Sequence, residues 1–465
     1  MTTRPVNLAT LSPAAAVTLG EFCAGLTLSA VPQDVLQVAR ACLIDTAAVA
    51  AFGSRFDWSQ AVARYAMAYG RGGPCKLMGM AGVRVHAPCA ALANGAFAHA
   101  FEQDSLRKPG AGVHPGAALF APALALAEER QATGERFLLA FVAACEAMFR
   151  IGNATLHSSE RLGFHAPGLT GPYGAAIAAG VIMGLGPAQL TSALGIAGSL
   201  SSGLLAFSAA TQGAEVKRLH LGRACESGVL AARLAEEGFC GPETILEGRF
   251  GLLQTYCAQS DAALLTQELG TTWETRRICL KAYPCHVTAH TPIESLRGLM
   301  AEAGFGPQDV AHMTLHVSHK VLSHHDIRTP HDILQGQYSV PFCVALALHA
   351  DPADPSVFNQ GAVADPEILQ TCADIRLVAF EEGAPRSAWA SRLQVRLKDG
   401  RVFEREADQF AGSPEQPLSR QQLEQRFNRL TNDYDTHARS TWFNSLSQVE
   451  DVANMSTLPD LAPAA

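Results

Sequence analysis

The chain has 465 residues, of which 48% are hydrophobic and 17% are charged, and its formal net charge at pH 7 is −8. This length predicts more than one hydrophobic core, and the negative charge gives no reason to expect nucleic acid or an acidic membrane surface as a partner. No run of about 18 uninterrupted apolar residues indicates a membrane span, and residues Met1–Pro13 lack the pattern of a secretory signal, so we expect a cytoplasmic protein.

The cysteines are scattered singly along the chain, and no two of them form a Cys-x-x-Cys pair. In a large chain without a secretory signal, this usage indicates reduced thiols rather than a disulfide framework. An iron–sulfur cluster needs grouped thiolates, so the sequence predicts none.

From about Pro13 to Glu268 the chain is rich in Ala, Gly and Leu and shows helical periodicity. Small residues let helices approach closely and bury more than one face, so we expect a helical bundle with little room for a sheet. We assign residues 1–272 to the first part of a large helical domain. The segments with wide apolar faces are Val35–Ala51, Pro115–Arg130, Gly174–Met183, Gln189–Gly203 and Arg223–Glu237.

A smaller α+β domain is predicted over residues 273–408. Ala311–Ser318 alternates apolar and polar residues, which is typical of a half-buried strand. Ala390–Arg405 alternates on both sides of Asp399-Gly400, and an Asp-Gly turn favours a hairpin. Helical patterns lie between these strands at Glu294–Ala303 and Tyr338–His349.

Residues 409–465 are expected to return to the helical domain. A helix is predicted from Pro417 to about Asn432, and the last residues from Leu458 are expected to be frayed. The predicted fold class is therefore mainly α, with a large all-helical domain and a smaller α+β domain.

Four stretches place an ionisable residue in a Gly- or Pro-rich turn ahead of a helix, and these residues are His114, His165, Lys217, and Lys281 with His286. Helix N-termini present free N–H groups and a partial positive charge, which suit carboxylates. Lysines supply further positive charge, and histidines carry protons near neutral pH. Together they predict a site that binds a small acid and moves one proton, although each residue alone also has a structural explanation as a cap, a turn residue or an exposed cation.

Three other patterns do not support a function. The histidine-rich stretch lacks a His-Glu-x-x-His motif and neighbouring thiolates, so we expect no metal site there. The stretch Gly198–Gly203 lacks the Gly-Lys-Thr ending of a phosphate loop, and no Gly-x-Ser-x-Gly elbow indicates a hydrolase. The histidines of that stretch are His312, His316, His319, His324, His325 and His331.

The stretches that carry the candidate site resemble motifs of the MmgE/PrpD family. The run Asn94–His99, followed by an acidic cluster and by His114-Pro-Gly-Ala-Ala, is similar to the first family motif. Leu219–Pro242 is similar to the most recognisable one. Lys281–His286 and Tyr338–Phe342 are similar to two later motifs, and the resemblance extends over residues 10–435.

This resemblance implies a discontinuous helical domain, a smaller lid domain, a site at their junction and a homodimer. It also implies chemistry without a metal or an organic cofactor. Position by position, it places His114, His165, Lys217, Lys281 and His286 in catalysis. It places Glu102, Asp104 and Tyr338 in substrate binding.

The sequence departs from the family pattern after His99. Family members carry an Asp-Phe-Asp-Asp-Thr-like run where this chain has Glu102–Leu106, and a longer loop, Arg107–Gly112, then precedes His114. The carboxylates remain, while a site hydroxyl is either lost or displaced to Ser105. The two additional cations, Arg107 and Lys108, belong either to a solvated surface insertion or to substrate choice.

The chemistries of this family share the gain or loss of a proton at a carbon next to a carboxylate. The resemblance implies a cofactor-independent lyase for a small di- or tricarboxylate, and we expect dehydration of a 2-methylcitrate- or citrate-like acid. A cis-aconitate-type decarboxylase, an epimerase of an imino or amino diacid and a catalytically silent binding member are the alternatives. We expect His114 and His165 to transfer protons and Lys217, Lys281 and His286 to hold carboxylates.

Overall fold

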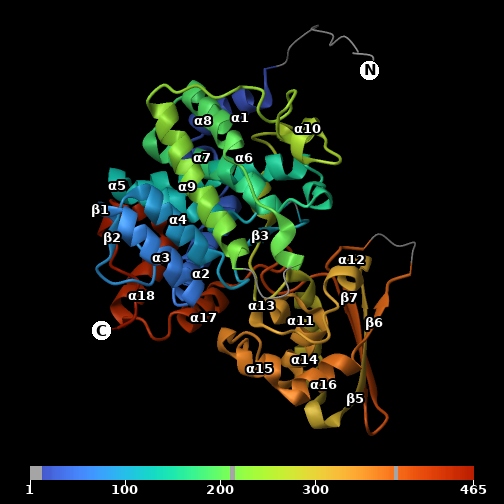
Figure 1. The fold of residues 1–465 in the computed structure, drawn as a ribbon. Helices are drawn as coiled ribbons and strands as arrows, with labels where there is room; N and C mark the ends of the chain where they lie inside the picture. The colour runs from blue at the N-terminus through green and yellow to red at the C-terminus, as the bar shows by residue number, and fades with distance from the viewer. Residues whose placement is uncertain (1–12, 111, 210–214, 382–385, 465) are drawn as a thin grey trace, which may run out of the picture.

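The computed structural model describes residues 13–110, 112–209, 215–381 and 386–464. It is mainly α-helical, as predicted, with a large group of helices and a smaller part that contains a sheet (Figure 1). The helices of the first part are α1 (Ala15–Gly25), α2 (Gln33–Gly53), α3 (Asp57–Tyr69), α4 (Ala87–Ala98), α5 (Ala121–Arg130), α6 (Gly134–Ala154), α7 (Ala166–Met183), α8 (Pro187–Ser199), α9 (Val216–Glu236) and the short α10 (Leu252–Tyr256).

Helix α9 packs against α4 on one side and α7 on another, and glycines make this close approach possible. A Cβ atom at Gly228 would lie 2.3 Å from the Cβ of Ala175 in α7, and one at Gly222 would lie 2.4 Å from the carbonyl oxygen of Leu92 in α4. Only a residue without a side chain fits at these two positions. The packing fixes the first turn of α9, which carries Lys217.

Among the described residues, α2 and α6 are long and apolar enough to cross a membrane by length and composition. However, 78% and 89% of their most apolar windows are buried inside the protein. This burial is what the central helices of a bundle require, because their apolar surface packs on all sides.

Two antiparallel ribbons interrupt the helical part, which therefore contains slightly more β-structure than expected. Strand β1 (Arg71–Lys76) pairs with β2 (Arg84–Val85). Strand β3 (Leu106–Arg107) pairs with β4 (Ile278–Cys279). The second ribbon matters for the site, because it joins the segment after α4 to the segment that leads into the smaller part.

The smaller part contains a four-stranded sheet in the order β6-β5-β7-β8. The predicted strand and hairpin are confirmed as β5 (Val310–Val317), β7 (Ser391–Leu397) and β8 (Val402–Ala407), whereas the parallel edge strand β6 (Arg376–Ala379) was not predicted. Helices pack beside this sheet (Figure 1). They are α11 (His290–Ala303), α12 (His319–His324), α13 (Ile333–Tyr338), α14 (Val340–His349), α15 (Gln360–Ala364) and α16 (Pro366–Asp374).

The chain then returns to the helical part, where α17 (Arg420–Leu430) and α18 (Thr436–Ser447) pack against α2. Arg426 donates to Asp45 at 2.6 Å, and the hydroxyl of Tyr434 donates to a carbonyl oxygen of α2 at 2.5 Å. The expectation of a frayed end is wrong for the described residues: Leu461 is 2% exposed, and the indole of Trp442 donates to the Pro459 carbonyl at 2.8 Å. Apolar side chains bury this tail despite its prolines.

The two crossings between the parts lie side by side. The backbone N–H of Leu280, on the way out, donates to the carbonyl oxygen of Gly412, on the way back, at 2.8 Å. The ammonium of Lys108 donates to the carbonyl oxygen of Asp408 at 3.0 Å. The two connections therefore form one joint next to the β3–β4 ribbon.

Glu146 in α6 holds the segment that enters this joint. Its buried carboxylate accepts hydrogen bonds from the backbone N–H groups of Glu274 and Thr275, at 3.0 and 2.8 Å, and from the Thr275 hydroxyl at 2.6 Å. It also pairs with Arg150 at 2.6 Å. One carboxylate thus anchors the turn that precedes β4.

We expect Glu146→Ala to lower the free energy of unfolding by about 3–5 kcal/mol, because it leaves the buried Arg150 guanidinium and two backbone N–H groups without their acceptor. Urea unfolding monitored by circular dichroism measures this change. Glu236→Ala is the control, since it removes an exposed ion pair with Arg130, and such pairs contribute about 0–1 kcal/mol. Equal losses in the two variants would contradict the anchoring role.

Candidate functional site

Two buried lysines share one carboxylate where the two parts of the protein meet. Lys217 begins α9, Lys281 follows β4, and Glu102 follows α4. The Glu102 carboxylate pairs with the ammonium of Lys217 and with that of Lys281, the latter at 3.1 Å. All three side chains are almost completely buried. The arrangement places two lysine amines against one carboxylate inside the protein.

Burial lowers the pKa of Lys217 well below its usual range, and the neighbouring Lys281 and Arg218 lower it further. Burial also lowers the pKa of Lys281, although Asp104 opposes this effect. The carboxylate of Glu102 between the two ammonium groups favours their charged forms. The backbone of Glu102 has φ of +54°, in the left-handed region that a residue with a side chain rarely adopts. Such backbone strain is concentrated at functional sites.

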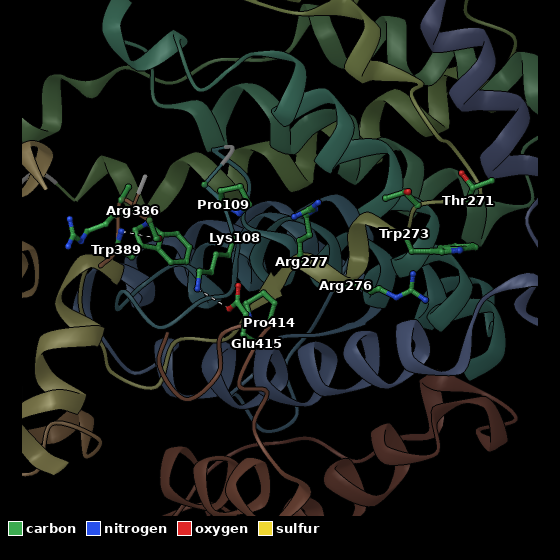
Figure 2. A pocket seen from close by; sticks show the side chains of 14 residues that line it. Lys108, Pro109, Thr271, Trp273, Arg276, Arg277, Arg386, Trp389, Pro414 and Glu415 are labelled. Atoms are coloured by element: carbon green, nitrogen blue, oxygen red, sulfur yellow. Dashed lines mark hydrogen bonds and ion pairs between the residues drawn. The ribbon is translucent and has the colours of Figure 1, made fainter. Parts of the chain in front are cut away.

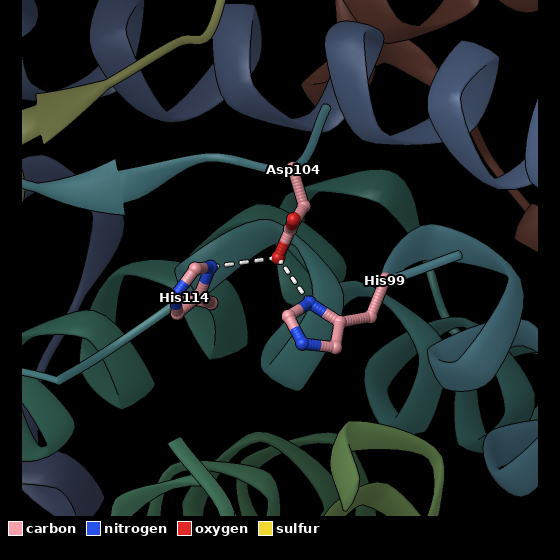
Figure 3. A group of neighbouring side chains, drawn as sticks. All are labelled: His99, Asp104 and His114. Carbon is pink, nitrogen blue, oxygen red and sulfur yellow. Dashed lines mark hydrogen bonds and ion pairs between the residues drawn. The ribbon is translucent and has the colours of Figure 1, made fainter. Parts of the chain in front are cut away.

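Asp104 holds two histidines on one carboxylate oxygen, as Figure 3 shows. Its Oδ2 atom lies 2.8 Å from Nδ1 of His99 and 2.7 Å from Nδ1 of His114. Burial raises the pKa of Asp104, but the attraction of the two histidines and their hydrogen bonds bring it well below its usual value. A carboxylate can only accept, so both rings carry a proton on Nδ1.

Burial lowers the pKa of His99 to about 4, although Asp104 opposes this shift. His99 is therefore neutral near pH 7. Among the described residues, neither its Nε2 atom nor the Oδ1 atom of Asp104 has a hydrogen-bond partner. These buried polar atoms are available to a bound molecule or to water.

His165 lies immediately before α7 and faces a second histidine. Its Nδ1 atom is 2.8 Å from Nδ1 of His220 in α9, and its ring centroid is 6.2 Å from that of His99. Burial lowers the pKa of His165 well below its usual value, and the histidines around it lower it further. His165 thus extends the group that begins at Asp104.

The smaller part contributes His286 and Tyr338. The ring of His286 stacks on that of His325 with centroids 3.9 Å apart, and its Nδ1 lies 2.8 Å from the Thr288 hydroxyl. The Tyr338 ring lies 5.5 Å from the His286 ring and 4.8 Å from the ammonium of Lys217. Burial lowers the pKa of His286 well below its usual value and raises that of Tyr338.

The structure therefore brings together all eight residues predicted from the sequence, and their individual roles stay predictions. Sequence reasoning did not select His99, His220, His325 and Gln337. The amide of Gln337 donates to the carbonyl oxygen of Phe101 at 3.1 Å and so ties α13 to the segment before Glu102. His99 and His220 lie within the family-like motifs, so the sequence showed their positions. It did not show which residues they contact.

Arg107 and Lys108 do not face this group of residues. Arg107 pairs with Glu274 at 2.7 Å, and Lys108 pairs with Glu415 at 2.9 Å. Lys108 lines a cavity of about 610 Å³, together with Arg277, Arg386 and Trp389 (Figure 2). Both cations hold the joint together, so their ion pairs do not favour a role in substrate choice. Lys108 is also buried, so it does not belong to a solvated surface insertion.

Ser105 does not supply a free hydroxyl to the site. Its buried oxygen accepts from the backbone N–H of Gly116 at 2.9 Å and lies 3.3 Å from the Cys42 sulfur. This contact fastens the π-helical turn Gly116–Phe120 that follows His114. Ser105 positions the backbone next to His114.

His99, Asp104 and His114 also form a group with three potential metal ligands, all within 4.8 Å of one another. Their nitrogen–oxygen distances of 2.7 and 2.8 Å are hydrogen-bond distances. A metal bound through these atoms would have to replace both Nδ1 protons. The donor set therefore fits a proton-carrying network better than a metal centre.

Comparison with known proteins identifies the family. Residues 17–265 match the MmgE/PrpD N-terminal domain and residues 283–448 match the MmgE/PrpD C-terminal domain, so the chain belongs to the MmgE/PrpD family. It is 26% identical over 472 residues to cis-aconitate decarboxylase of Aspergillus terreus, covering 95% of this chain and 93% of that protein.

Two further relatives carry similar names. The chain is 27% identical to the cis-aconitate decarboxylase-like protein oryM of Aspergillus oryzae, covering 92% of this chain and 93% of that protein. It is 25% identical to human cis-aconitate decarboxylase, covering 94% and 90%. The predicted enzyme class, a lyase, is thereby confirmed.

We expect the protein to lose stability as the pH falls from about 6.5 toward 4. Burial lowers the pKa of His99, His220 and His325 to about 4 in the folded protein, whereas an unfolded histidine titrates near 6.5. The unfolded chain therefore binds more protons in this window, and acid favours unfolding. Melting temperatures measured across this range at constant ionic strength test the expectation. His99→Gln should reduce the proton uptake on unfolding by about one, and an unchanged pH dependence would contradict the neutral state of His99.

Proposed function

We propose that the protein decarboxylates cis-aconitate or a closely related unsaturated tricarboxylate, using only its own side chains. The observation that carries the proposal is the buried group of two lysines and proton-carrying histidines, in a chain similar over nearly its whole length to proteins named cis-aconitate decarboxylase. These relatives support decarboxylation more than the dehydration that we expected from the motifs.

The lysines bind the acid in this proposal. Each ammonium has three donors, and Glu102 uses one donor of Lys217 and one of Lys281, so donors remain for substrate carboxylates. Lys217 lies in the first turn of α9, where the helix N-terminus adds positive potential. Positive charge fixed in a buried site stabilises the negative charge that develops as carbon dioxide leaves.

The histidines supply the proton. Loss of carbon dioxide leaves an electron pair on carbon, and a proton must then reach that carbon. His114 and His165 are the proposed donors. Asp104 fixes the tautomer and orientation of His114 and stabilises the positive charge when this ring is doubly protonated.

Residues 273–408 act as a lid in this proposal, since they contribute Lys281, His286 and Tyr338 while the helical part contributes the remaining residues. Closure of the two parts around the acid excludes water from the developing charge. The buried state of the lysines is the closed form of the site.

Incubation of the purified protein with cis-aconitate is expected to release carbon dioxide and an equal amount of a five-carbon unsaturated dicarboxylate. Carbon dioxide trapping and chromatography measure the two products. Parallel reactions with 2-methylcitrate and citrate test dehydration, which would give new ultraviolet absorbance without carbon dioxide. A change in the optical rotation of an imino or amino diacid would support an epimerase instead, and calorimetric binding without any turnover would support a silent binding member.

We expect Asp104→Asn to lower kcat by roughly 10²–10⁴-fold with little change in KM, because Asp104 orients His114 rather than binding the acid. Steady-state kinetics on cis-aconitate measure both constants. The control is Asp435→Asn, an identical substitution at the N-cap of α18, where asparagine caps as well as aspartate does. A rise in KM with unchanged kcat would show that Asp104 acts in binding.

A further inference from the structure

His165 and His220 contact each other through their Nδ1 atoms. Two Nδ1 atoms 2.8 Å apart form a hydrogen bond only if one of them carries a proton and the other does not. Phe207 packs its ring edgewise against both imidazoles, with centroids 5.2 Å from His165 and 5.9 Å from His220. A Cβ atom at Gly203 would lie 3.4 Å from Nδ1 of His220, so a glycine leaves room for the contact. The surroundings hold the two rings together.

The two rings lie at different depths. His165 is 6% exposed and belongs to the buried group around Asp104. His220 is half-buried and lines a second cavity, of about 430 Å³. Leu204 and Leu219 line the same cavity and are 59% and 38% exposed, so the cavity opens to the solvent. The pair therefore connects the interior of the site to the outside.

Decarboxylation needs such a connection. A carboxylate that leaves as carbon dioxide gives its bonding electron pair to carbon, so each turnover consumes one proton, and the proton comes from the solvent. We propose that His220 relays this proton from the solvent to His165, which delivers it to the reacting carbon. This inference rests on the proposed function and adds His220 as a positioning residue that acts through His165.

One proton moves inward along the pair in each turnover. The carbon–carboxylate bond breaks, and the new electron pair on carbon takes the Nε2 proton of His165. Nδ1 of His165 takes the Nδ1 proton of His220, while Nε2 of His220 takes a proton from water in the cavity. Both rings start and end neutral with exchanged tautomers, and proton exchange with solvent during product release restores the starting tautomers.

The charges around the pair favour neutral rings, which such a relay requires. Burial, together with the neighbouring His99 and Lys217, lowers the pKa of His220 to about 4. Arg223, which lines the same cavity, is paired with Glu226 at 2.5 Å. With both rings neutral near pH 7, neither ring repels the other, and the Nδ1–Nδ1 hydrogen bond holds the single proton between them.

Two variants of His220 test the relay against a purely structural role. Asparagine places an amide near the position of Nδ1 and can keep the hydrogen bond, but it cannot pass a proton from water. Alanine leaves a space next to the cavity that imidazole can enter. We expect both variants to lower kcat on cis-aconitate at least about tenfold with KM nearly unchanged. Added imidazole should restore most of the kcat of His220→Ala and none of that of His220→Asn.

Leu219→Ala is the matched control, since it alters the same cavity without touching either ring, and we expect its kcat to be unchanged with or without imidazole. Circular dichroism and melting temperatures verify that each variant is folded. Wild-type activity in His220→Asn would overturn the relay and leave the decarboxylase proposal intact. Folded but unrescued His220→Ala would also overturn the relay. Absence of turnover by the wild-type protein would overturn the proposed function, and the relay with it.

Discussion

Two ammonium groups buried around a single carboxylate impose the main constraint on this structure. Charges removed from water are costly unless they are paired, and breaking such a pair leaves an uncompensated charge in the interior. Lys217, Lys281 and Glu102 come from three distant segments, so these segments must be held in register. The glycine contacts of α9, the β3–β4 ribbon and the Glu146 anchor all serve this requirement. Two lysines that share one carboxylate also keep donors free for an anionic substrate.

Proton transfer is separated in space from this positive centre but is coupled to it electrostatically. Burial keeps His99 and His165 neutral near pH 7, and Lys217 contributes to the low pKa of His99. A neutral imidazole with a protonated Nδ1 can accept on Nε2, and one with a protonated Nε2 can donate. Burial therefore keeps these histidines in the neutral forms that proton transfer needs.

Periodicity and turn chemistry predicted the helices, the hairpin at Asp399-Gly400 and the fold class, because these depend on local patterns of apolar residues. Strand β6 escaped prediction since its four residues form a short, partly exposed edge. The motifs located the eight site residues, but the contact between His165 and His220 joins positions 55 residues apart, and no local pattern encodes it. The ion pairs of Arg107 and Lys108 depend on Glu274 and Glu415, which are 167 and 307 residues away in the sequence, so their place at the joint could not be inferred.

The two crossings of the chain between its parts also bear on how the proposed lid would close. Lys281 follows directly after Leu280, whose N–H is bonded to the returning segment at Gly412, whereas Tyr338 lies far along the chain in α13. If the proposed lid moves about this joint, Lys281, which adjoins it, is displaced little. An incoming acid would therefore meet both lysines already in place and would be enclosed by Tyr338 afterwards. In that movement, binding of the acid by the lysines would precede its enclosure by Tyr338.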